Sequence, residues 1–155
     1  VWARGQAWVV YGLALAYDYT KDEKLYQIQK KATNKFIELL PADNVPAWDM
    51  VFRDTKTLKD TSAGVIATCG MLEMNKLLPR HSDAERWNEK VHEIVRALID
   101  NHLTNDENNG SSSILMHGTS SVRHNSGINE SLIYGDYYYM ETLMRMSNPN
   151  WKRYW

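Results

Sequence analysis

Apolar positions change their pattern from one predicted helix to the next. From Gly5 to Tyr17 the chain carries no charged residue, and a helix without a polar face is expected to be buried on all sides. We therefore predict a buried helix over about residues 2–19. The next predicted helix, over about residues 23–40, has one apolar stripe among charged residues, as a helix packed on one side does. That stripe consists of Leu25, Ile28, Ala32, Phe36 and Leu39.

The same alternation repeats further along the chain. Asp60-Thr61-Ser62 predicts the start of a helix of small, nearly neutral residues that ends near Leu78. An amphipathic helix is predicted from Asp83 to about Leu103, and a last helix, rich in tyrosine, from Ser131 or Ile133 to Met146. Residues 105–113 form a predicted polar turn, and residues 114–118 a short extended segment. The pattern predicts an all-α fold of about five helices, arranged as hairpins of one inner and one outer helix.

Composition and charge fit one globular domain over residues 1–155. Of the 155 residues 43% are hydrophobic and 24% are charged, and the formal net charge is −1. This balance predicts no nucleic-acid partner, and the apolar runs are too short to predict a membrane span. Cys69 has no second cysteine to pair with, which favours a reducing, cytoplasmic location. We find no phosphate loop and no metal-ligand spacing, and so expect no metal or cofactor.

The start of the first helix offers the best candidate for binding chemistry. Arg4 and Trp8 lie one turn apart, beside the free N–H groups of a helix start. A guanidinium and an indole in that position suit a carboxylate on a ring-shaped ligand. The alternative is that Arg4 forms an ion pair inside the fold. Trp48 and Asp49 in the proline-containing loop either line a pocket or complete the packing, and His117 either contacts a ligand or is structural.

Four sequence blocks, taken in order, resemble those of the unsaturated glucuronyl hydrolases, glycoside hydrolase family 88. Residues 2–8 read Trp-Ala-Arg-Gly-Gln-Ala-Trp, and residues 40–49 read Leu-Pro-Ala-Asp-Asn-Val-Pro-Ala-Trp-Asp. Residues 60–64 read Asp-Thr-Ser-Ala-Gly, and residues 132–141 read Leu-Ile-Tyr-Gly-Asp-Tyr-Tyr-Tyr-Met-Glu. The resemblance covers essentially the whole chain. It implies that the five helices are part of an (α/α)6 toroid, and we expect this chain to be the C-terminal half of six hairpins.

The resemblance also implies a reaction. In this family an aspartic acid protonates C4 of a 4,5-unsaturated uronic acid at the non-reducing end of a lyase product, water adds at C5, and the hemiketal collapses. The family's acid/base aspartate and its supporting aspartate belong to blocks that precede the first block found here, so we expect them upstream of residue 1. If this chain acted alone, Asp49, Asp60 and Asp136 would be the candidate carboxylates. We expect a missing N-terminal half, or another chain, to complete the ring.

The resemblance carries substrate-binding roles to a few positions. Arg4 and Trp8 match positions near the substrate, with Trp2 and Gln6 as weaker candidates. The C-terminal residues Ser147 to Lys152 look like the Ser-x4-Lys element that is associated with sulfated substrates in the streptococcal branch. The expected partner position holds the acidic Asp18, which argues against that preference. The alternative for Lys152 is a solvated tail residue.

Two other functions compete with this interpretation. The unsaturated rhamnogalacturonyl hydrolases share the toroid and the mechanism, but tend to show Arg-Gly-Asn-Gly-Trp where this chain has Arg-Gly-Gln-Ala-Trp. A non-catalytic helical binding scaffold would predict regular repeats and a polar concave surface. The irregular loop over residues 41–59, with its two prolines and Trp48, counts against the scaffold.

Overall fold

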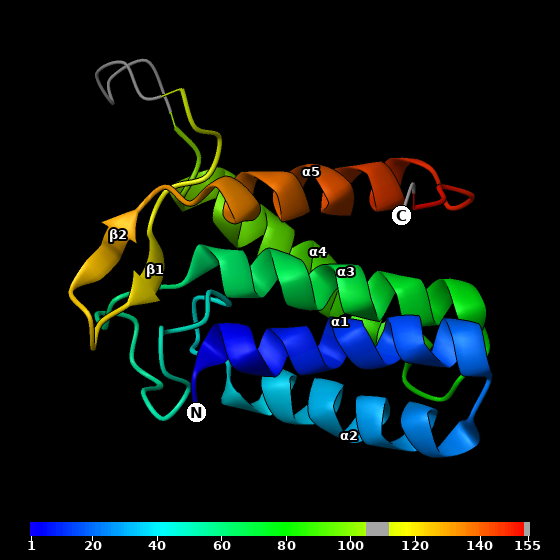
Figure 1. Ribbon diagram of the computed structural model, residues 1–155. Helices are drawn as coiled ribbons and strands as arrows, with labels where there is room; N and C mark the ends of the chain where they lie inside the picture. Colours follow the sequence, from blue (N-terminus) through cyan, green and yellow to red (C-terminus); the bar gives the residue numbers. More distant parts are fainter. Residues whose placement is uncertain (105–111, 154–155) are drawn as a thin grey trace.

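The computed structural model describes residues 1–104 and 112–153, which form five helices and one β-hairpin (Figure 1). The five predicted helices are confirmed. The polar turn predicted over residues 105–113 lies mostly outside the described residues. The helices are α1 (Ala3–Thr20), α2 (Glu23–Leu39), α3 (Thr61–Leu77), α4 (Ala84–Asn101) and α5 (Ile133–Ser147), and the strands are β1 (Gly118–Ser121) and β2 (Ser126–Glu130).

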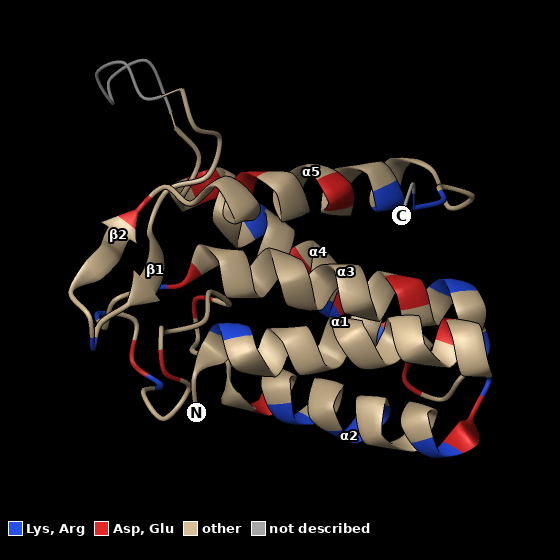
Figure 2. Cartoon of the chain, in the orientation of Figure 1, with Lys and Arg blue, Asp and Glu red and all other residues tan. Residues whose placement is uncertain are grey.

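The helices form two layers, as their polarity predicts. α1, α3 and α5 lie side by side, while α2 packs against α1 and α4 packs against α3 (Figure 1). α3 lies in the middle of the inner layer and is buried from Thr61 to Met71. Charged residues are sparse along α1 and α3 and frequent along α2 (Figure 2). A neutral helix is tolerated at the centre because it leaves no charge without water or a partner.

Glycine sets the spacing between the two neutral helices α1 and α3. A Cβ atom on Gly70 of α3 would lie only 2.8 Å from the Cα atom of Tyr11 on α1. The two backbones therefore approach more closely than any other residue at position 70 allows. This approach brings the starts of α1 and α3 together, where the candidate site lies.

Polar contacts join the two outer helices. Asp83 at the start of α4 forms an ion pair with Lys30 of α2 (2.8 Å), and Trp87 Nε1 donates a hydrogen bond to Asn34 Oδ1 (2.9 Å). Burial by itself would raise the pKa of Asp83, but hydrogen bonds from Lys30 and Arg86 outweigh it and lower the pKa to about 2. The outer layer is thus held by directional contacts as well as by apolar packing.

The β-hairpin is the one element that the sequence did not predict. β1 pairs with β2 in antiparallel orientation, with Thr119 opposite Ile128. The strands read Gly-Thr-Ser-Ser and Ser-Gly-Ile-Asn-Glu, which lack the alternating apolar pattern of a strand on a core. Tertiary contacts define the hairpin instead: Thr119 Oγ1 donates to the carbonyl of Lys59 (2.7 Å).

The junction of α3 and α5 is also buried. Cys69 is fully buried, and its Sγ lies 3.3 Å from Thr142 Oγ1 and 3.6 Å from the carbonyl oxygen of Tyr138. Burial raises the pKa of the Cys69 thiol well above its usual range. The sequence interpretation of Cys69 as a core residue therefore agrees with its position.

The two outermost helices of the inner layer carry exposed apolar side chains. On α1 they include Trp8 and Val9, and on α5 they form a stripe of Ile133, Tyr137, Met140 and Met144. Ile133 is 83% exposed. Among the described residues, no helix has both the length and the apolar character that a membrane span needs. We call these two surfaces the α1 edge and the α5 edge.

Candidate functional site

Arg4 is buried at the point where α1, α3 and the hairpin meet. Its Nη1 forms an ion pair with Asp60 Oδ2 (2.8 Å) and also contacts the Thr119 carbonyl (3.1 Å). Its Nη2 donates to the carbonyl of Ser120 (2.7 Å). The guanidinium therefore fixes β1 against the starts of two helices. The ion pair inside the fold, one of the two alternatives for Arg4, is present.

Two aromatic rings enclose the Arg4 guanidinium. Its Cζ lies 5.0 Å from the ring centroid of Trp2 and 4.9 Å from that of Tyr134. The Trp2 ring folds back over the helix start, where Gly5 leaves room for it: a Cβ on Gly5 would lie 2.8 Å from Trp2 Cε3. Two cation–π contacts therefore add to the hydrogen bonds that hold the guanidinium in place.

Asp60 is the fully buried anion of this site. Its Oδ1 accepts a hydrogen bond from Ser62 Oγ (2.5 Å), and its side chain makes no capping hydrogen bond to α3. Burial raises the pKa of Asp60, while the neighbouring Arg4 favours the charged form. Asp60 thus precedes α3, as predicted, and its carboxylate binds both Arg4 and the Ser62 hydroxyl in the first turn of α3.

A cavity of about 440 Å³ opens beside Arg4. Trp2 and Trp48 contribute indole surface, and the hairpin residues 120–123, including Arg123, form the opposite side. Apolar ring surface next to guanidinium groups is the combination that binds a sugar ring bearing an acidic group. We call this cavity the Arg4 pocket.

The other two candidates on α1 point in different directions. Trp8 is 38% exposed and contacts the edge of Tyr138, with ring centroids 5.2 Å apart. Gln6 Nε2 donates to the carbonyl of Ala32 on α2 (3.3 Å), on the outer-layer side of α1. A ligand that approaches the inner layer can therefore reach Trp8, whereas Gln6 contacts the outer helix α2.

Ser147 and Lys152 lie at the far end of the molecule. Arg153 next to Lys152 pairs with Asp18 (2.9 Å), which is 14 residues along α1 from Arg4, or about 21 Å at 1.5 Å per residue. Ser147 Oγ donates to the carbonyl of Met144 in its own helix (3.2 Å). The structure brings the C-terminal element close to Asp18, as expected, but does not bring it to the Arg4 pocket.

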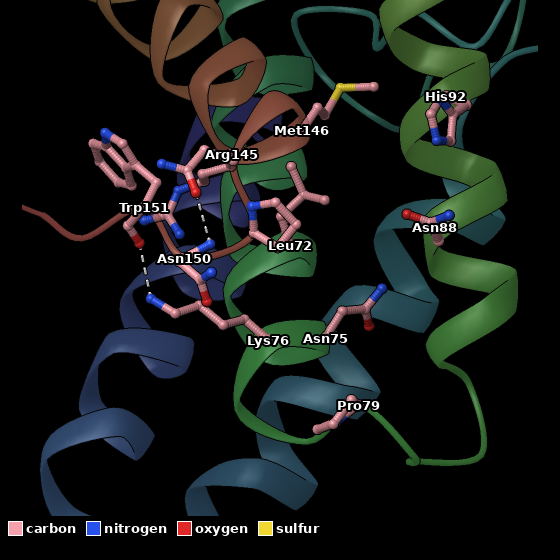
Figure 3. Close-up of a pocket in the computed structure, with 12 residues that line it drawn as sticks. Leu72, Asn75, Lys76, Pro79, Asn88, His92, Arg145, Met146, Asn150 and Trp151 are labelled. Carbon is pink, nitrogen blue, oxygen red and sulfur yellow. Dashed lines mark hydrogen bonds between the residues drawn. The ribbon is translucent and has the colours of Figure 1, made fainter.

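A second cavity of about 460 Å³ lies at that far end, between α4 and the segment after α5 (Figure 3). Leu72 and Met146 contribute apolar surface, and Asn88 and His92 face it from α4. Lys76 Nζ donates to the carbonyl of Trp151 (2.9 Å), which holds the C-terminal segment over the end of α3.

The three candidate carboxylates of this chain all have structural partners. Asp136 accepts hydrogen bonds from the backbone N–H groups of Ile114 (3.1 Å) and Leu115 (2.8 Å). Asp49 accepts one from the N–H of Val51 (3.0 Å), and Asp60 is bound to Arg4. Each carboxylate is thus already engaged by hydrogen bonds or an ion pair within the chain, as suits a structural role.

Sequence reasoning missed the hairpin side of the pocket. Arg123 is exposed at the turn between β1 and β2, and Ser120 supplies a carbonyl to Arg4. Neither residue belongs to a predicted element. The one available signal is the run of turn-forming residues His-Asn-Ser-Gly at 124–127, because a turn between polar segments is compatible with a hairpin.

The fold and the pocket together define an inner and an outer layer of helices with an aromatic, cationic cavity at one end of the inner layer. No protein-family model matches the chain. The unsaturated chondroitin disaccharide hydrolase of Streptococcus pneumoniae is 41% identical over an alignment of 156 positions, which covers 99% of this chain and 39% of that protein.

Solved structures agree with this similarity. An unsaturated glucuronyl hydrolase mutant from Streptococcus agalactiae, complexed with dGlcA-GalNAc6S, superposes with a TM-score of 0.93 at 40% identity, covering 100% of this chain and 41% of that one. The enzyme from Bacillus sp. GL1 gives a TM-score of 0.86 at 31% identity, covering 96% of this chain and 40% of that one. Over nearly its whole length the chain is similar to these unsaturated glucuronyl hydrolases, and it spans about two fifths of the length of the relatives it matches.

Proposed function

We propose that this chain forms the substrate-binding part of a glycoside hydrolase. The whole enzyme would release a 4,5-unsaturated uronic acid from the non-reducing end of lyase-generated glycosaminoglycan oligosaccharides by hydration of the vinyl ether. The observation that carries the proposal is the Arg4 pocket, in which Trp2 and Trp48 flank a guanidinium fixed by Asp60. The names of the relatives favour this substrate class over unsaturated rhamnogalacturonides.

Each part of the pocket has a task in this reaction. The indoles of Trp2 and Trp48 offer flat apolar surface to the sugar faces, and Trp8 extends that surface along α1. Arg4, whose Nη atoms already bind Asp60 and β1, forms the floor of the pocket, and Arg123 adds a second guanidinium beside it that would attract the uronic acid carboxylate. Holding the ring in one pose reduces the entropy that must be lost on the way to the transition state.

The acid/base aspartate is proposed to lie outside these residues. Such a group must alternate between protonated and charged forms, but Asp49, Asp60 and Asp136 are already engaged by backbone or guanidinium donors. The relatives extend well beyond the matched region. The α1 and α5 edges are where we propose that the remaining inner helices, from the N-terminal half or another chain, complete the ring.

Preference for a sulfated substrate is the least supported part of the proposal. The Streptococcus agalactiae complex contains a sulfated disaccharide, but Lys152 lies at the opposite end of α1 from the Arg4 pocket. Only an oligosaccharide long enough to reach both ends could contact Arg4 and Lys152 together. We retain Ser147 and Lys152 as predicted contacts for a longer substrate. The cytoplasm is the proposed compartment, on the basis of the unpaired, buried Cys69.

The decisive measurement is turnover of an unsaturated chondroitin disaccharide, followed by loss of the ultraviolet absorbance of its double bond. We would compare the folded 155-residue chain with the same chain joined to the preceding part of the Streptococcus pneumoniae relative. We expect no turnover by the chain alone and turnover by the extended protein. Turnover by the chain alone would mean that Asp49, Asp60 or Asp136 performs the chemistry.

The binding role is tested in the extended protein. Trp2→Leu and Trp8→Leu each remove ring surface, and we expect each to raise KM by about tenfold, the loss expected for one stacking contact. Tyr19→Leu, at the other end of α1, is the matched control and should leave KM unchanged. An active extended protein whose KM is insensitive to both tryptophan substitutions would place the substrate elsewhere.

A further inference from the structure

Two histidines from different elements face one another beside the hairpin. His102 follows the last turn of α4, and His117 precedes β1. Their Nδ1 atoms are 2.8 Å apart, and their rings meet edge to face with centroids 4.9 Å apart. We call these residues the histidine pair. They border a cavity of about 510 Å³ that is separate from the Arg4 pocket.

The hydrogen bond of the histidine pair limits how many protons it can hold. One Nδ1 must carry a hydrogen and the other must present a lone pair. The pair can therefore be neutral, or it can take up one proton as an imidazolium that donates to a neutral ring. A second proton places two N–H groups and two positive charges against each other, so the bond is lost.

Backbone strain adds to this sensitivity. His117 has a φ of +61°, a left-handed conformation that is unfavourable for a residue with a Cβ atom. Its carbonyl accepts the N–H of Thr61 (3.4 Å), and the N–H of Met116 donates to the carbonyl of His102 (2.8 Å). Loss of the side-chain bond therefore removes one of the few contacts that hold His117 in this conformation.

The hairpin connects this strain to Arg4. Gly118 follows His117 directly, and the carbonyls of Thr119 and Ser120 are the acceptors for Arg4. A change of φ at His117 would redirect the first residues of β1 and move both acceptors. The histidine pair is thus only two residues along the chain from the groups that position the guanidinium.

The surroundings do not supply a compensating charge. Asp43 and Lys59 face the pair from the loop before α3, but they form an ion pair with each other (2.6 Å). Burial, followed by the charge of His117, lowers the pKa of His102 to about 4, and Asp43 and Lys59 act on it in opposite directions. Within the described residues, no group of three His, Cys, Asp or Glu side chains could hold a metal ion here.

We propose that the histidine pair is a proton-sensitive fastening of the hairpin: it holds β1 in the conformation that binds Arg4, and it releases β1 when both imidazoles are protonated. As a control of substrate binding, this inference rests on the proposed function. The fastening itself is a property of the folded chain and can be tested without any substrate, so the two proposals can fail separately.

The test is amide hydrogen exchange of β1 between pH 7 and pH 3.5, expressed relative to the amides of α1 in the same sample. The released hairpin can hold two protons on the histidine pair, whereas the fastened hairpin can hold only one. Protection of β1 should therefore fall by up to about tenfold per pH unit where the second proton binds only to the released form. We expect at least a tenfold loss of β1 protection relative to α1. Unchanged relative protection over this range would overturn the proposal.

Two variants separate the pair from general acid effects. His117→Asn should keep β1 protected at low pH, because asparagine tolerates the left-handed conformation and its amide can either donate to or accept from His102. His92→Asn changes an exposed histidine of α4 and should retain the wild-type pH dependence. If His117→Asn loses β1 protection as the wild type does, the pair is not the cause.

Discussion

The pair of Arg4 and Asp60 joins the start of α1 to the start of α3 inside the protein. Removing one partner of a buried pair leaves an uncompensated charge, which costs about 3–5 kcal/mol. We expect Arg4→Met to lower the free energy of unfolding by about 3 kcal/mol at pH 7, measured by urea denaturation. Arg53→Met, at an exposed arginine, is the control and should change it by less than about 0.5 kcal/mol.

The same substitution should change the pH dependence of stability. Burial already raises the pKa of Asp60, and without Arg4 the folded state will favour the protonated carboxyl still more. A carboxyl whose pKa is raised by folding destabilises the fold increasingly as the pH rises from its unfolded pKa to its folded pKa, and not at all below the unfolded pKa. The deficit of Arg4→Met should therefore shrink as the pH falls from 7 towards 4. If the loss of stability in Arg4→Met instead grew as the pH fell, Asp60 would not be the buried charge that the substitution leaves without a partner.

At the residue level, the sequence is informative only where neighbours along one helix carry the signal. Arg4 and Trp8 stand out because they lie one turn apart at a helix start, and the structure places both at the inner layer. The partners of Arg4 could not be predicted, because Asp60 and Thr119 lie 56 and 115 residues away in the sequence. Helical periodicity carries no information about contacts at that separation.

At the scale of elements, two glycines in neighbouring helices should behave in opposite ways. Gly70→Ala inserts a Cβ against the Tyr11 backbone, and we expect it to lower the free energy of unfolding by about 1–3 kcal/mol. At Gly12 a Cβ would meet nothing within 4 Å, so Gly12→Ala should raise it by up to about 1 kcal/mol. Thermal unfolding of both variants measures the difference. Equal effects would mean that the close approach of α1 and α3 is not limiting.

The contact between α2 and α4 should weaken in acid. Asp83 has a folded pKa of about 2, below its ordinary value of 3.8. A carboxyl whose pKa is lowered by folding contributes stability above its unfolded pKa, and that contribution is lost as the pH falls through the folded pKa. We expect Asp83→Asn to be less stable than wild type at pH 6 and nearly equal to it at pH 2, by chemical denaturation. If the difference in stability between wild type and Asp83→Asn did not change with pH, the ion pair of Asp83 with Lys30 would be excluded as its source.

The helices could be predicted and the hairpin could not, for a physical reason. In neutral α3 and in amphipathic α4, the pattern of apolar residues along the helix itself predicts how much of the helix surface is buried. β1 and β2 have no such pattern, because Arg4 and the pairing strand satisfy their backbone groups and the Thr119 hydroxyl binds the carbonyl of Lys59. The side of the Arg4 pocket formed by the hairpin was missed for the same reason.

At the scale of the whole molecule, the α5 edge should govern self-association. Apolar stripes left open on a folded protein favour contact with other surfaces. We expect Met140→Gln together with Met144→Gln to reduce association of the 155-residue chain, measured by sedimentation, with little change in its unfolding. In the extended protein the same two substitutions should lower the unfolding temperature, because the added helices would then cover the α5 edge. Ile28→Gln, at an exposed position of α2, is the control and should affect neither measurement strongly.

The buried thiol between α3 and α5 can report how often these two helices separate. Cys69 reacts only as a thiolate in contact with reagent, and burial denies it both conditions while α5 stays in place. The rate at which a thiol reagent adds one label per chain therefore reports how often α5 separates from α3. If further helices hold α5 in the extended protein, the same reagent should label Cys69 more slowly in the extended protein than in the 155-residue chain. A single cysteine then measures, in seconds or hours, how firmly the inner layer is closed.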